Sequence, residues 1–74
     1  MAKLGRYDVE VEYIGKDGNV WDSHCVLLTD DYDEAYKTAM ETEVCENEQV
    51  AIWEWDENES VVEDSWVVKE YEQK

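Results

Sequence analysis

Apolar and acidic residues alternate without interruption between residues 7 and 13. This period of two is typical of a strand with one buried face and one solvated face. The apolar face would carry Tyr7, Val9, Val11 and Tyr13, and the solvated face would carry Asp8, Glu10 and Glu12. We therefore expect a row of three exposed carboxylates on this strand.

Lys16, Asp17 and Gly18 follow this strand and predict a three-residue hairpin loop, with Gly18 in the left-handed conformation. The apolar faces of the two strands then coincide in a single register. That register sets Tyr13 opposite Trp21, Val11 opposite Ser23, Val9 opposite Cys25 and Tyr7 opposite Leu27. On the acidic face it sets Glu12 opposite Asp22 and Glu10 opposite His24.

An amphipathic helix is predicted within residues 29–44, because apolar side chains recur there at i, i+3, i+4, i+7 and i+8. Asp31 is expected to cap its first turn, together with Glu34 three residues later. The apolar stripe consists of Tyr32, Ala35, Tyr36, Ala39, Met40 and Val44.

Two further strands are expected after the helix. Residues 49–56 are expected to form the first of these strands. One of its faces carries Ala51, Trp53 and Trp55, and we expect Trp53 to be a core position. The other face carries Glu54 and Asp56 together with the apolar Val50 and Ile52. Residues 61–71 favour a strand through their Val, Trp and Tyr content. A closing helix stays open as an alternative, since Ser60 and Glu63 fit a capping box.

These elements predict a single α+β domain over residues 1–74, with an antiparallel sheet in the order β-β-α-β-β. The helix would pack on one face of the sheet, and the opposite face would be acidic.

Charge composition then restricts the possible partners. The chain has 21 Asp and Glu residues against 6 Lys and Arg, which gives a formal net charge of -15. Such a charge argues against binding nucleic acid or an anionic membrane directly, and favours a basic partner. No signal peptide or membrane segment is evident, so we expect a cytoplasmic protein. Cys25 and Cys45 are accordingly expected to be free thiols.

Catalytic and cofactor motifs are not found. His24 and Cys25 are neighbours on a predicted strand, so their side chains point to opposite faces and do not form a catalytic dyad. Two cysteines and one histidine are too few for a structural zinc site, and no EF-hand or nucleotide-binding loop is present. We expect a protein that is not an enzyme and has no cofactor and no dedicated metal site.

The acidic residues are therefore the candidate functional feature. Carboxylates along a strand repeat at a spacing similar to that of successive phosphates, so the array matches a Lys- and Arg-rich groove that holds a nucleic-acid backbone. The predicted partner-binding residues are Asp8, Glu10, Glu12, Asp30, Asp33, Glu54, Asp56, Glu57, Glu59, Glu63 and Asp64.

In its short length, acid content and aromatic core, the chain resembles the small phage-encoded inhibitors, including DNA-mimicking anti-CRISPR and anti-restriction proteins. This resemblance implies an inhibitor that occupies the basic groove of a nucleic-acid-binding protein, such as a CRISPR effector, in the host bacterial cytoplasm. Two alternatives stay open. One is an acidic soluble domain without mimicry, and the other is a phage or bacterial regulatory adaptor that docks through Trp55, Trp66 or Tyr71.

Overall fold

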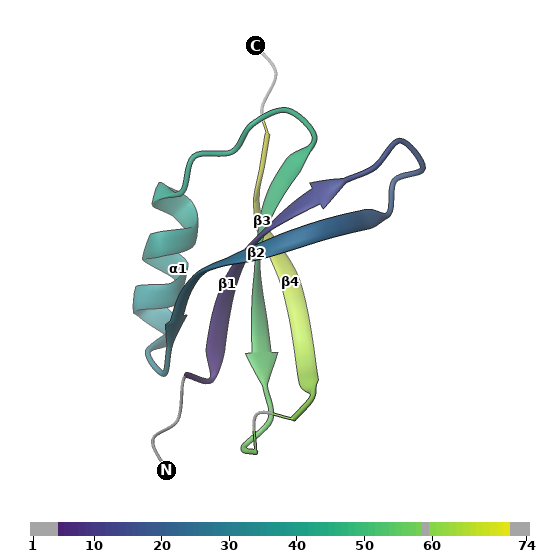
Figure 1. Cartoon of the computed structure of the whole chain (residues 1–74). Coiled ribbons are helices and arrows are strands. Elements are labelled where there is room, and N and C mark those ends of the chain that lie inside the picture. Colours follow the sequence, from purple (N-terminus) through teal and green to yellow (C-terminus); the bar gives the residue numbers. More distant parts are fainter. Residues whose placement is uncertain (1–4, 59, 72–74) are drawn as a thin grey trace.

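The computed structural model describes residues 5–58 and 60–71, and they form a four-stranded antiparallel sheet with one helix (Figure 1). The order along the chain is β-β-α-β-β, which confirms the predicted α+β fold and the strand at the end. The elements are β1 (Tyr7–Ile14), β2 (Val20–Thr29), α1 (Tyr32–Glu41), β3 (Glu48–Trp55) and β4 (Val62–Glu70).

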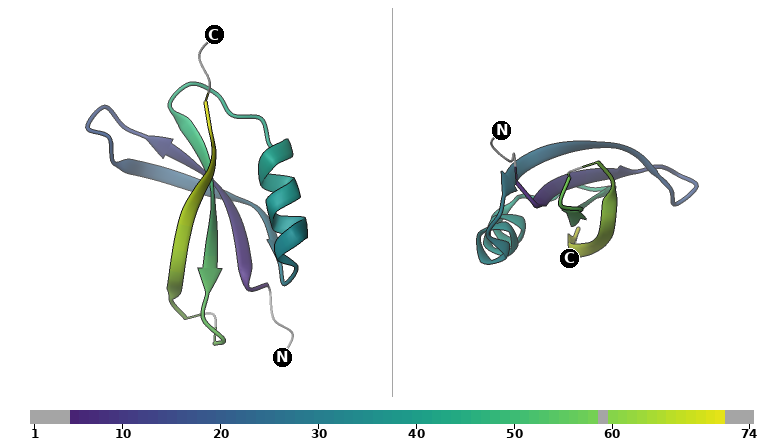
Figure 2. Two further views of the ribbon diagram at one scale, coloured as in Figure 1. Left: turned by 180° about the vertical axis from the view of Figure 1, so that it is seen from behind. Right: turned by 90° about the horizontal axis from the view of Figure 1, so that it is seen from below.

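Within the sheet the strand order is β2-β1-β3-β4, so β1 and β3 are central. The sheet is strongly twisted, and α1 contacts all four strands from one side (Figure 2). We call the opposite side the open face, because no helix or strand in residues 5–58 and 60–71 covers it. Within the same ranges, no helix has the length and apolar character needed to cross a membrane.

The β1–β2 hairpin has the predicted loop. Gly18 has a φ of 84°, and its N–H donates to the Gly15 carbonyl at 3.0 Å, while the Gly15 N–H donates to Asn19 at 2.8 Å. Ile14 pairs with Val20, as the predicted register requires. The loop chemistry therefore predicts this end of the hairpin correctly.

Two bulges in β2 overturn the rest of the predicted register. After the first bulge, Tyr13 pairs with Asp22, Val11 with His24 and Glu10 with Cys25; after the second, Val9 pairs with Leu27 and Tyr7 with Thr29. Each bulge adds one residue to β2 and shifts the pairing by one. Leu27 returns to the helix side, as expected, but Cys25 lies between the bulges and is on the open face. Glu12 pairs with Ser23, so the expected like-charge pair with Asp22 is also absent.

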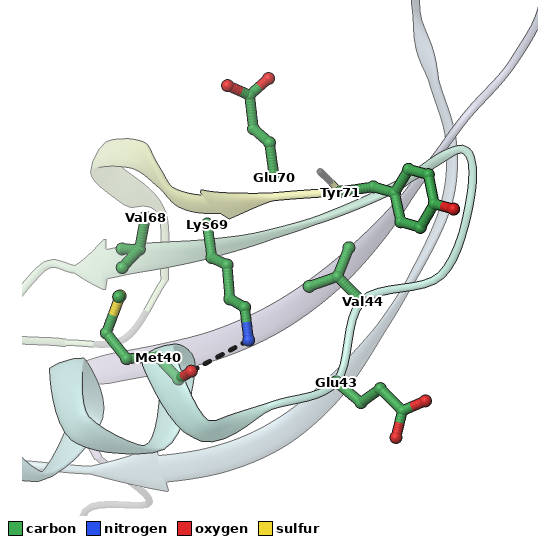
Figure 3. A pocket seen from close by; sticks show the side chains of 7 residues that line it. All are labelled: Met40, Glu43, Val44, Val68, Lys69, Glu70 and Tyr71. Atoms are coloured by element: carbon green, nitrogen blue, oxygen red, sulfur yellow. Dashed lines mark hydrogen bonds between the residues drawn. The ribbon is translucent and has the colours of Figure 1, made fainter. Parts of the chain in front are cut away.

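Helix α1 begins where the sequence predicts. The Asp31 carboxylate accepts hydrogen bonds from the backbone N–H groups of Asp33 and Glu34 at 2.9 and 3.4 Å. Glu34 does not complete a capping box, because its carboxylate accepts instead from the Thr29 hydroxyl at 2.6 Å. At the other end, the Lys69 ammonium from β4 donates to the carbonyl of Met40 at 3.0 Å (Figure 3) and to that of Thr42 at 2.8 Å. A cation therefore compensates the helix C-terminus.

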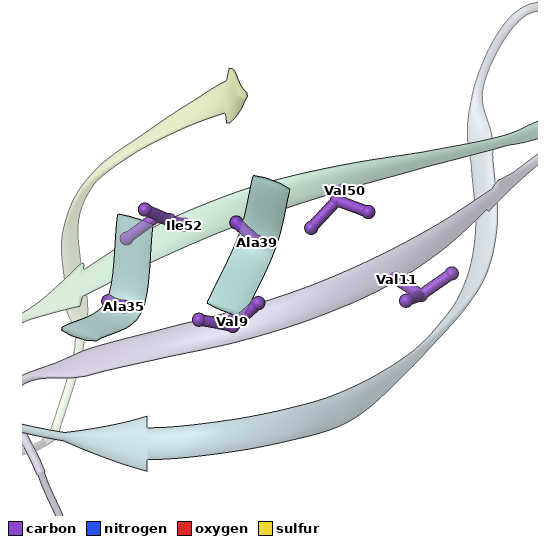
Figure 4. Close-up of a cluster of buried hydrophobic side chains, with 6 residues drawn as sticks. All are labelled: Val9, Val11, Ala35, Ala39, Val50 and Ile52. Carbon is purple, nitrogen blue, oxygen red and sulfur yellow. The ribbon is translucent and has the colours of Figure 1, made fainter. Parts of the chain in front are cut away.

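The hydrophobic core lies between α1 and the central strands (Figure 4). Small alanines on the helix allow it to approach the sheet closely. The core consists of Val9, Val11, Ala35, Ala39, Val50 and Ile52. The prediction for β3 was therefore inverted: Val50 and Ile52 face the helix, whereas Ala51 and Trp53 are on the open face.

Candidate functional site

The carboxylates of β1 are buried. Asp8, Glu10 and Glu12 are 6 %, 5 % and 8 % exposed, although they lie on the open face as the alternation predicts. The expected row of solvated charges is therefore wrong for this strand. Their proposed contact with a partner stays a prediction, and their burial argues against it, because a buried carboxylate presents little charge to a basic surface.

Indole groups from β3 cover this row. Trp53 stands opposite Asp8 in the register, yet its indole N–H donates to Glu12 at 3.0 Å, so the ring extends along β3 past Ala51. Trp55 donates its indole N–H to Asp8 at 3.3 Å. Gln49 donates its side-chain amide to the second oxygen of Glu12 at 2.8 Å. Because Ala51 is small, it leaves room for the Trp53 ring.

Glu10 and Cys25 lie next to Asp8, and their ionisation is disfavoured. Burial raises the pKa of Glu10 to about 7, and the neighbouring Asp8 carboxylate adds to this shift. Burial also raises the pKa of the Cys25 thiol to about 12, with Asp8 and Glu10 contributing. These three side chains form a compact group with an excess of negative charge.

A second set of carboxylates lies at one end of the sheet. We call it the acidic end, and it comprises Asp30, Asp33, Glu54, Asp56, Glu57, Glu63 and Asp64. These residues come from the β2–α1 junction, the first turn of α1, the end of β3, the β3–β4 turn and the start of β4, which lie together at the lower end of Figure 1. All are exposed except Glu54 and Asp56, which are half-buried. Glu59 was also predicted to bind a partner and lies outside the described residues.

Arg6 connects three segments of the acidic end. Its guanidinium Nε donates to Glu54 at 3.0 Å, and its Nη2 lies 3.6 Å from Glu63. Its backbone N–H donates to Asp30 at 2.9 Å. The Glu54 carboxylate raises the pKa of the Arg6 guanidinium. Both ion pairs within the described part of the chain use this arginine. Arg6 was not among the predicted site residues, although it is the single arginine of an acidic chain and could have been noticed for that reason.

Some acidic-end carboxylates have a structural role. Asp56 holds the β3–β4 turn, since its carboxylate accepts from the Ser60 N–H at 2.7 Å and from the Ser60 hydroxyl at 2.9 Å. In contrast, the carboxylates of Asp33 and Glu57 are exposed and form no hydrogen bond or ion pair with another described residue. The crowding of acids at this end therefore includes charges that the fold does not require.

The aromatic residues proposed for docking are distributed differently. Trp66 packs against the core, and Trp55 is bound to Asp8. Tyr71 is 43 % exposed and lines an open pocket of about 650 Å³ between the end of α1 and β4 (Figure 3). Trp21, which the sequence analysis did not consider for docking, is 62 % exposed at the hairpin tip, where its indole N–H donates to Asp17 at 3.0 Å.

The geometry provides no nucleophile beside a base at His24 and Cys25. His24 pairs with Val11 of the helix side and Cys25 pairs with Glu10 of the open face, so their side chains point apart. Comparison of the chain with protein-family models, with curated proteins and with solved structures finds no match. The chemistry of the described residues is therefore the basis for proposing a function.

Proposed function

We propose that this protein is a small acidic inhibitor that occupies the basic nucleic-acid-binding groove of another protein. The observation that carries the proposal is the acidic end, where carboxylates from separate segments meet around a single arginine. A Lys- and Arg-rich groove built for a phosphate backbone has the complementary charge. A CRISPR effector in a bacterial cytoplasm is one target of this kind.

The acidic end is held in place before any partner arrives. Arg6 joins β3, β4 and the β2–α1 junction, while Asp56 fixes the β3–β4 turn. Because these backbone segments are already positioned, binding costs little backbone entropy, and the exposed side chains lose rotamer freedom only. Exposed Asp33, Glu57 and Asp64 would then contact the partner's cations. The buried carboxylates of β1 would serve the fold and not the interface.

The test begins with capture of a target from a bacterial lysate on the immobilised protein, followed by elution in salt steps. With the captured target purified, the affinity of the parent is compared with that of Glu57→Lys combined with Asp64→Lys. We expect a loss of about 100-fold or more, because like charges placed against each other cost several kcal/mol. The target's own DNA or RNA should compete with the parent protein.

A matched control carries the same charge change at the opposite end of the molecule. Glu43 and Glu46 are exposed in the α1–β3 connection, so Glu43→Lys combined with Glu46→Lys alters the net charge equally. This control should bind far better than the acidic-end variant. Equal weakening by both would mean that only net charge matters, and full binding by the acidic-end variant would contradict the proposal.

The second candidate function is docking through an exposed aromatic side chain, and it is favoured by Trp21 at the hairpin tip. Trp21→Ala removes this ring at an exposed position, so the fold should persist. If Trp21→Ala abolishes target binding while the acidic-end variant binds normally, the adaptor function replaces the inhibitor proposal.

A further inference from the structure

Two carboxylates and one thiol meet on the open face, away from the acidic end. The oxygen atoms of Asp8 and Glu10 in β1 and the sulfur of Cys25 in β2 all lie within 4.8 Å of one another. The two bulges of β2 produce this arrangement, because they place Cys25 opposite Glu10 and on the same face.

The buried Asp8 carboxylate has one oxygen that lacks an ordinary hydrogen-bond donor. The residue is 6 % exposed, and within the described residues its Oδ1 atom has no hydrogen-bond donor other than the acidic protons of Glu10 and Cys25. The other oxygen, Oδ2, accepts from the Trp55 indole, which leaves Oδ1 for the group with Glu10 and Cys25. Glu12, two residues beyond Glu10, differs because both its oxygens accept hydrogen bonds, from Gln49 and Trp53.

We propose that Asp8, Glu10 and Cys25 bind one divalent cation of the zinc class. A thiolate combined with carboxylates selects a borderline-soft ion such as Zn²⁺ over Ca²⁺ or Mg²⁺, which prefer oxygen ligands alone. The cation would also supply the positive charge that a buried pair of carboxylates lacks. The site departs from the expectation that the chain has no dedicated metal site, which rested on the small number of cysteine and histidine residues and on the absence of an EF-hand loop.

The distances are compatible with a zinc ion. Zn–O bonds of about 2.0–2.2 Å and Zn–S bonds of about 2.3 Å place neighbouring ligand atoms less than 4.8 Å apart, which is the limit that encloses the present group. Three protein ligands leave a fourth position for water. The exposed Cys25 on the edge strand gives an ion access. Without a metal, burial and then the neighbouring Asp8 carboxylate raise the pKa values of Glu10 and Cys25. Binding at neutral pH would release to solvent the Cys25 proton and, from the chains in which Glu10 is protonated, the Glu10 proton as well.

The whole chain, reduced and freed of metal with a chelator, is titrated with Zn²⁺ in competition with a chromophoric zinc indicator. We expect one ion per chain. Titration with Co²⁺ should give the thiolate-to-cobalt charge-transfer absorption that reports a Co–S bond. Ca²⁺ at the same concentrations should not displace either metal.

The two cysteines provide a matched pair of variants. Cys25→Ser should abolish the charge-transfer band and lower the Zn²⁺ affinity by at least about 10-fold, whereas Cys45→Ser should leave both unchanged. Trp55→Phe removes the N–H donor that orients Asp8, and it should lower the affinity by about 10-fold without removing the Co–S band. Circular dichroism checks that each variant is folded.

A measurement on the unmodified chain covers the case in which a variant does not fold. Zn²⁺ should slow the alkylation of Cys25 but not of Cys45, as read by mass spectrometry of peptides. The proposal is overturned if Zn²⁺ protects neither thiol, if no stoichiometric binding is found, or if folded Cys25→Ser binds Zn²⁺ as well as the parent does. The last result would show diffuse binding by surface acids only.

Discussion

Carboxylates occur in two contrasting environments in this small domain. On β1, Asp8, Glu10 and Glu12 are buried beneath indole rings, and Asp8 and Glu12 accept hydrogen bonds from side chains of β3. At the acidic end, most carboxylates are exposed, and Arg6 is the cation that they share. The same residue type therefore contributes to the fold in one region and presents charge to solvent in the other. Sequence composition alone does not separate these roles.

Charge reversal should distinguish the two environments most strongly. Glu12→Lys places a buried cation against the amide of Gln49 and the indole N–H of Trp53, which are both donors. We expect a loss of about 3–5 kcal/mol in unfolding free energy, enough to unfold much of a small domain. Glu57→Lys, at an exposed position, should leave stability unchanged or slightly higher. Urea unfolding followed by circular dichroism measures both, and similar losses in the two variants would contradict the burial of the β1 row.

The pH dependence of the unfolding free energy should provide a second test of the burial of the β1 carboxylates. The pKa of Glu10 is raised from 4.5 to about 7, so the folded protein holds a proton that the unfolded chain releases. Stability from this group is present in full below pH 4.5 and is lost as the pH rises through 7. We therefore expect the unfolding free energy of the metal-free protein to fall by roughly 2 kcal/mol between pH 5.5 and 8.

Glu10→Gln is the control for this measurement, since glutamine keeps the shape but does not ionise. The variant should lose most of the pH dependence in that window. An unchanged pH profile in Glu10→Gln would exclude Glu10 as the titrating group.

The two thiols should differ in reactivity by a smaller amount. Cys25 has its pKa raised to about 12, mainly by burial, whereas Cys45, in the α1–β3 connection, has its pKa raised chiefly by the nearby Glu48 carboxylate. Since the thiolate is the reactive form, Cys25 should be alkylated at least about 10-fold more slowly than Cys45 in metal-free protein at pH 8. Peptide mass spectrometry after timed alkylation gives both rates.

Asp8→Asn tests the cause of that difference. Removing the Asp8 charge should speed the alkylation of Cys25 and leave that of Cys45 unchanged. The predicted register put Cys25 on the helix side, opposite Val9, and burial there would also have slowed its reaction. The structure places it on the open face, where burial of the thiol, and to a smaller extent the charges of Asp8 and Glu10, provide the expected protection.

The sequence patterns predicted the elements well because those patterns are local. Alternation defines β1, the loop with Gly18 defines its turn, and Asp31 marks the start of α1. Bulges are not visible in this way. One extra residue in β2 reverses which face Cys25 occupies, and no turn residue or periodicity marks the position.

The burial of Asp8, Glu10 and Glu12 could not be predicted from β1 alone, because it depends on side chains from β3. An alternating strand shows which residues share a face but not what covers that face. Val50 and Ile52 were the available signal. Their apolar character favours the helix side, and this would have placed Trp53 beside the carboxylates.

Salt should have the smallest effect, and it reports on the acidic end. Raising the ionic strength from about 0.01 to 0.15 M shortens the Debye length from about 30 to 8 Å and so weakens repulsion between exposed charges. For the parent we expect the unfolding free energy to gain about 1 kcal/mol or less, which is a rise of a few degrees in Tm for a domain of this size.

Two variants locate the repulsion. Glu57→Lys combined with Asp64→Lys should reduce the rise in Tm, because it removes repulsion at the exposed surface. Glu12→Gln, which removes a buried charge and keeps the side-chain shape, should change the rise less. If Glu12→Gln has the larger effect on the salt dependence, the repulsion is centred on β1, and the assignment of exposed charge to the acidic end is wrong.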